Sequence, residues 1–94
     1  MKKPLKQHIL TVNMRHRRFD VFEAKLPKDV LGECYKGAHE IRIQKGLRAQ
    51  VHLDTVLHEA LHACFRDATE EAVFETARSL MDLLWRLGYR RCEL

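Results

Sequence analysis

The spacing of the apolar residues changes near Arg48, and this change limits the folds that the chain can adopt. Before it, polar and apolar residues alternate with a period of two, as in His39-Glu40-Ile41-Arg42-Ile43-Gln44, which is typical of a half-buried strand. After it, the spacing is that of a helix. A chain of 94 residues is long enough for one modest core. The sequence therefore predicts one α+β domain over residues 1–94, with strands first and helices last.

Three segments of the first half are β-prone. Residues 9–14 and 19–24 are rich in β-branched and aromatic side chains, and the basic stretch between them is a predicted hairpin turn. The alternating segment 39–44 adds another strand. We therefore expect residues 1–47 to be mainly strands, in a short antiparallel or mixed sheet.

Two helices are predicted in the second half. The first, over residues 48–65, is the expected active-site helix. Asp67 or Thr69 can cap the second, the expected glutamate helix over residues 69–87, and Gly88 is placed to stop it.

The first predicted helix contains His58-Glu59-Ala60-Leu61-His62. At about 100° per residue the two histidines lie about 40° apart, with Glu59 beside them, on the side opposite to the apolar residues. Imidazoles at i and i+4 can share one Zn²⁺, and a coordination position left to water makes such a site catalytic. Glu59 is placed to take the proton of the zinc-bound water as general base.

A third ligand is expected from the second helix. Glu70 projects near the middle of its apolar stripe, where a carboxylate is costly unless a positive partner meets it. A zinc ion held by His58 and His62 would be that partner. The alternatives are Glu71 and Glu75, and more remotely His39, His52 and Cys34.

At H-E-A-L-H followed by E-E-A-V-F-E-T-A-R-S-L, the chain resembles the zincin metallopeptidases, and more narrowly minimal gluzincin-like members. SprT-like and phage or mobile-element metallopeptidases are similar in layout, although no histidine follows His62 here as it would in SprT-like enzymes. The resemblance covers residues 32–87. It implies a short sheet, an active-site helix and a glutamate helix, with His58 and His62 as zinc ligands, Glu59 as general base and Glu70 as the glutamate ligand.

Substrate contacts are less defined. A strand edge at Ile41 and Ile43 could bind an extended peptide through backbone hydrogen bonds, although an internal strand fits the same pattern. Oxyanion stabilisation could come from Tyr89, Tyr35 or an arginine, and nothing in the sequence selects one.

The leading hypothesis is a zinc-dependent metallopeptidase acting on a peptide or protein substrate. The alternative is a basic module that binds nucleic acid or protein and carries a structural or vestigial metal site. Residues 1–54 hold 12 Lys and Arg against 6 Asp and Glu, and a basic surface attracts nucleic acid. The candidate contacts are Lys2, Lys3, Lys6, Arg15, Arg17 and Arg18.

Three cysteines without a C-x-x-C pair indicate reduced thiols rather than disulfides or a cysteine-based zinc finger. The sequence has no membrane-spanning run, and its start lacks the apolar stretch of a signal peptide, so we expect a cytoplasmic protein without membrane contact. An oligomer that completes the cleft is a further expectation, because the second lobe of larger zincins is missing.

Overall fold

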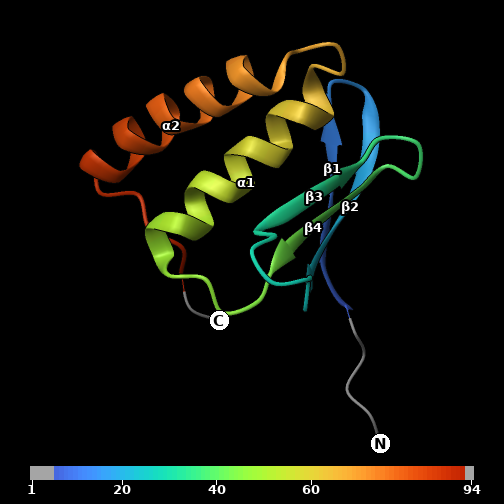
Figure 1. Ribbon diagram of the computed structural model, residues 1–94, viewed down its shortest axis with the longest axis horizontal. Coiled ribbons are helices and arrows are strands. Elements are labelled where there is room, and N and C mark those ends of the chain that lie inside the picture. Colours follow the sequence, from blue (N-terminus) through green and yellow to red (C-terminus); the bar gives the residue numbers. More distant parts are fainter. Residues whose placement is uncertain (1–5, 93–94) are drawn as a thin grey trace, which may run out of the picture.

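The computed structural model describes residues 6–92 as a sheet followed by two helices (Figure 1). The strands are β1 (Lys6–Met14), β2 (Arg17–Ala24), β3 (Gly32–Tyr35) and β4 (Glu40–Gln44), and the helices are α1 (Ala49–Cys64) and α2 (Glu70–Arg86). This confirms the α+β class. The predicted bounds of both helices are correct to within one residue at each end.

The sheet is mixed, with the strand order β1-β2-β4-β3. β1 and β2 form an antiparallel hairpin, β2 and β4 run parallel, and β3 pairs with β4 in the antiparallel sense. β3 was not predicted as a strand, because its four residues are too few to establish an alternating pattern. It forms an edge of the sheet, beside α1 (Figure 1).

The basic hairpin turn between β1 and β2 is tied to the end of α1. Arg15 and His16 both have positive φ values, 50° and 72°, as tight two-residue hairpins require. Arg15 donates a hydrogen bond of 3.3 Å to the carbonyl of Cys64, and Arg17 donates one of 3.2 Å to that of Ala63. Cationic donors suit a helix C-terminus, where carbonyl groups lack partners. These arginines therefore hold the hairpin against α1.

The core lies between the sheet and α1, and α2 packs on α1 (Figure 1). Phe19 of β2, Ile41 and Ile43 of β4 and Ala63 of α1 are its buried residues. The proposal of a peptide-binding edge at Ile41 and Ile43 is therefore wrong. β4 is internal, so its backbone already pairs on both sides, and its two isoleucines are only 3% and 1% exposed.

α2 buries less of its apolar stripe than its pattern suggests. Val73, Ala77 and Met81 are buried, whereas Phe74 and Leu87 are exposed. The reason is that α2 rests on one helix rather than on a sheet, so only the row of residues facing α1 is covered. No helix among residues 6–92 is long and apolar enough to cross a membrane.

The position of Ile43 in the core gives a first prediction. Replacing Ile43 by Ala should lower the free energy of unfolding by about 2–5 kcal/mol, because it removes buried methyl groups and leaves a cavity. Leu31→Ala, at a side chain that is 46% exposed, serves as the control and should change it by less than about 1 kcal/mol. Urea denaturation measures both. Equal stabilities of Ile43→Ala and the parent would contradict the internal position of β4.

Candidate metal centre

His58 and His62 lie on consecutive turns of α1, and both direct Nε2 toward the start of α2. Their ring centroids are 4.9 Å apart. Residues 65–69 then reverse the chain (Figure 1). Thr69 caps α2, as predicted, by accepting a hydrogen bond of 3.1 Å from a backbone N–H of its first turn. This cap places Glu70, the first residue of α2, across the last turns of α1.

The carboxylate of Glu70 bridges the two imidazoles. Oε1 lies 2.7 Å from Nε2 of His58, and Oε2 lies 2.9 Å from Nε2 of His62. One ligand atom from each of the three residues lies within 4.8 Å of the others, and no other such group occurs within residues 6–92. The structure thus brings together His58, His62 and Glu70, the leading predicted metal ligands.

The other candidate ligands lie apart from this group. Glu71 and Glu75 are exposed on α2. His39 stacks on a core phenylalanine, and His52 is bonded to an arginine of the C-terminal segment. Cys34 lines the same pocket as the histidines but is not one of the three converging residues.

Glu70 reaches the histidines for a different reason than expected. The prediction that it lies on the buried side of α2 is wrong, since its side chain is 74% exposed. It begins the helix, where no preceding turn covers it. Desolvation is the largest single effect and raises the pKa of Glu70, but the hydrogen bonds and charges of the two histidines together outweigh it and leave the pKa below its usual value. Glu70 is therefore an anion at neutral pH.

Glu59 is in the opposite situation. The sequence placed it away from the apolar side of α1, but the structure buries it at 7% exposure, because α1 lies between the sheet and α2 and β3 covers this turn. A Cβ atom added to Gly32 would lie 2.8 Å from Cγ2 of Thr55 and 3.0 Å from Glu59. Burial raises the pKa of Glu59 to about 7. The carboxyl can therefore gain or lose a proton near neutral pH.

The donor set of this group fits a divalent cation. Two imidazole nitrogens and one carboxylate are common catalytic zinc ligands, and both nitrogens already point to a single anion. Burial lowers the pKa of His62, which favours the neutral imidazole that binds metal. One feature is unusual for a metal site. Nδ1 of His62 is buried and has no hydrogen-bond partner in the described part of the chain, whereas ligating histidines usually donate a hydrogen bond from the ring nitrogen that does not bind the metal.

A polar pocket of about 310 Å³ opens over the three converging residues. Besides His58, His62, Glu70 and Glu59, it is lined by Cys34 and Lys36. Burial, together with the negative charge of Glu59, raises the pKa of Cys34 to about 11. Cys34 is thus a neutral thiol beside the site rather than a thiolate.

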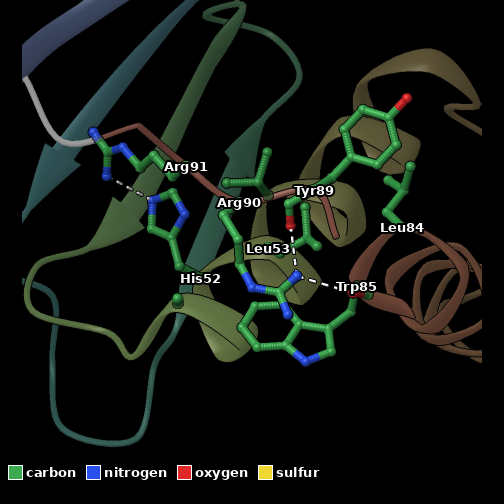
Figure 2. Close-up of a pocket in the computed structure, with 9 residues that line it drawn as sticks. His52, Leu53, Leu84, Trp85, Tyr89, Arg90 and Arg91 are labelled. Carbon is green, nitrogen blue, oxygen red and sulfur yellow. Dashed lines mark hydrogen bonds between the residues drawn. The ribbon is translucent and has the colours of Figure 1, made fainter. Parts of the chain in front are cut away.

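A second pocket of about 310 Å³ lies between the first half of α1 and the end of α2 (Figure 2). Leu53, Val56 and Leu84 are among its apolar lining. Figure 2 shows the guanidinium of Arg90 over the indole of Trp85, 3.3 Å from the ring centroid. Arg90 also donates to the carbonyl of Trp85 in the last turn of α2 and to that of Tyr89, just beyond the helix. These contacts hold the C-terminal segment against the helices, and the pocket contains no group resembling the metal centre.

The candidate nucleic-acid contacts that the structure describes lie at different places on the β1–β2 hairpin. Lys6 pairs with Glu40 at one end of the β1–β2 hairpin, and Arg15 and Arg17 bind the end of α1 at the other. Arg18 lines a separate polar pocket on the hairpin. The remaining candidates, Lys2 and Lys3, lie outside the described residues.

Two residues of the site were missed from the sequence. Gly32 was not among the predicted site residues, although its lack of a side chain is what lets β3 approach Glu59. A glycine at the start of a short strand is the signal that was available. Lys36 lines the metal pocket, but a lysine before a glycine in a turn carries no pattern that separates it from ordinary surface lysines.

The approach of β3 to α1 gives a second prediction. Gly32→Ala should lower the free energy of unfolding by about 1–3 kcal/mol, because the new methyl group meets Thr55 and Glu59 closer than van der Waals contact allows. Gly37→Ala is the matched control, since a Cβ there meets nothing within 4 Å. Thermal unfolding of the two variants compares them. If Gly32→Ala is as stable as Gly37→Ala, β3 does not cover Glu59 as described.

Protein-family models, curated proteins and solved structures give no match to this chain.

Proposed function

We propose that the protein is a zinc-dependent metallopeptidase of the zincin type. The observation that carries this proposal is the meeting of two Nε2 atoms and one carboxylate, all within 4.8 Å, beside a separate buried carboxyl group, Glu59. A metal site that only stabilises the fold does not require a second carboxyl group such as that of Glu59. His58, His62 and Glu70 would hold the ion and leave part of its coordination open to the pocket.

A bound zinc ion would supply Lewis-acid chemistry, lowering the pKa of water and polarising a carbonyl. The protein itself moves the proton. The Glu59 carboxylate accepts a proton from the attacking water, and the resulting carboxyl donates it to the amide nitrogen as the C–N bond breaks. A pKa of about 7 suits both steps, since a group with a pKa near the working pH can accept and donate.

We assign the peptide-binding edge to β3 instead of β4. β3 pairs only with β4 among the described strands, and its residue Cys34 lines the metal pocket. An extended peptide that adds to this edge would pass directly over the pocket. The substrate class is therefore an extended peptide or an unfolded segment of a protein.

The alternative, a binding module with a structural metal site, has weaker support. Arg15, Arg17 and Lys6 each contact another part of the chain. Nucleic-acid contact, oligomer formation and a cytoplasmic location stay predictions.

Metal binding by Glu70 gives the third prediction. The parent should contain about one zinc per chain, and Glu70→Gln should bind zinc more than about 100-fold more weakly, because loss of even an indirect partner of a ligand costs about 10–100-fold. Glu71→Gln is the matched control, one residue along the same helix and exposed. Competition with a chromophoric chelator measures all three affinities. Equal affinities in the two variants would move the third ligand elsewhere.

Proton transfer by Glu59 gives the fourth prediction. Glu59→Gln keeps the shape of the side chain but cannot accept a proton, so zinc content should be unchanged while peptide hydrolysis falls by about 10²–10⁴-fold. Hydrolysis of a fluorogenic peptide library measures the activity, and circular dichroism establishes that the variant is folded. A folded, zinc-loaded Glu59→Gln protein as active as the parent would exclude this mechanism.

A further inference from the structure

One positively charged side chain lines the metal pocket, and it comes from the turn between β3 and β4. Of the six residues around this pocket in the described chain, Lys36 is the only lysine or arginine. Its Nζ donates a hydrogen bond of 2.8 Å to the carbonyl of Arg66, just beyond the end of α1. This bond uses one of three ammonium protons. The other two are available to the pocket.

The ammonium group is electrostatically close to the site. Lys36 lines the same pocket as His58, His62 and Glu70. Its positive charge opposes the rise in the pKa of Cys34. The hydrogen bond to the carbonyl of Arg66 ties the ammonium group to the segment just beyond α1.

The two tyrosines that the sequence offered for stabilising negative charge are engaged elsewhere. The hydroxyl of Tyr35 donates to Glu33, and the Tyr35 ring lies under the guanidinium of Arg42. Tyr89 lines the second pocket, between α1 and α2 (Figure 2). Neither tyrosine lines the metal pocket, and Lys36 is its one cationic lining residue in the described chain.

We propose that Lys36 binds and stabilises the oxyanion of the scissile peptide group, an inference that rests on the proposed peptidase function. The water oxygen bonds to the carbonyl carbon, the π electron pair moves to the carbonyl oxygen, and Glu59 holds the water proton. The Lys36 ammonium donates a hydrogen bond to the new oxyanion. When the C–N bond breaks, the electron pair returns to re-form the carbonyl, and Glu59 delivers the proton to the leaving nitrogen. No other reactant is required.

The inference requires Lys36 to act in the transition state more than in the substrate complex. Lys36→Met, loaded with zinc, should therefore show a kcat about 10²–10³-fold below that of the parent, as expected for loss of one oxyanion donor, with little change in KM. Lys36→Arg, which keeps a cation and donors, should retain more activity than Lys36→Met. Lys28→Met, at an exposed lysine of the loop before β3, is the control and should behave as the parent.

A binding measurement adds a readout that does not depend on turnover. A phosphonamidate peptide carries the tetrahedral anion, and the corresponding amide peptide does not. By isothermal titration calorimetry, zinc-loaded Lys36→Met should lose affinity for the phosphonamidate by about the factor lost in kcat/KM and bind the amide peptide as the parent does. If Lys36→Met has a lower thermal stability, Lys36→Gln replaces it, because the amide keeps a donor for the Arg66 carbonyl without the charge.

Each outcome decides between distinct roles. A Lys36→Met protein with unchanged kcat and phosphonamidate affinity would overturn the inference, leaving Lys36 as a turn contact. A loss seen in KM, and only for substrates with a free carboxylate, would also overturn it and make Lys36 a substrate anchor. If Glu59→Gln abolishes hydrolysis while Lys36→Met does not, the peptidase proposal stands and the role of Lys36 falls. If Glu59→Gln stays active, the peptidase mechanism itself is lost.

Discussion

The convergence of His58, His62 and Glu70 depends on how α1 is held in place. α1 is the middle layer of the molecule, with the sheet on one side and α2 on the other (Figure 1). The hairpin arginines bind the last carbonyls of α1, which stabilises the end of the helix. The chain then reverses within five residues, and the Thr69 cap fixes the direction of α2. Both imidazoles therefore face the same carboxylate while all three side chains stay on regular helices.

The sheet contributes to the site chiefly through its edge. β3 is the shortest strand, yet it covers Glu59, lines the pocket with Cys34 and leads into the turn that carries Lys36. A larger residue at position 32 would push this strand away from α1. The edge thus performs two tasks, since it buries the carboxyl group on one side and presents a free backbone on the other.

Patterns with a short period were easy to predict, and features that depend on the contact between elements were not. The helix bounds, the Thr69 cap and the histidine pair follow from the local spacing of residue types, which can be read directly from the sequence. The burial of Glu59 does not, because a helix packed on two sides has no single apolar face. Glu70 was selected for a burial that it does not have, and it still meets the histidines because of where α2 begins. The internal place of β4 follows from the strand order, which alternation cannot reveal.

Two glutamates eleven residues apart have opposite properties because their surroundings differ. Glu70 stands at an exposed helix start with two imidazoles against it, and its pKa is lowered, so it is a permanent anion suited to a cation. Glu59 lies under β3, and burial raises its pKa to about 7, so it exchanges a proton at neutral pH. Proteins use different environments to separate the pKa values of neighbouring carboxyl groups. One group can then perform acid–base chemistry while the other stabilises charge. Exchanging the two surroundings would remove the properties that suit Glu70 to the proposed ligand role and Glu59 to the proposed base role.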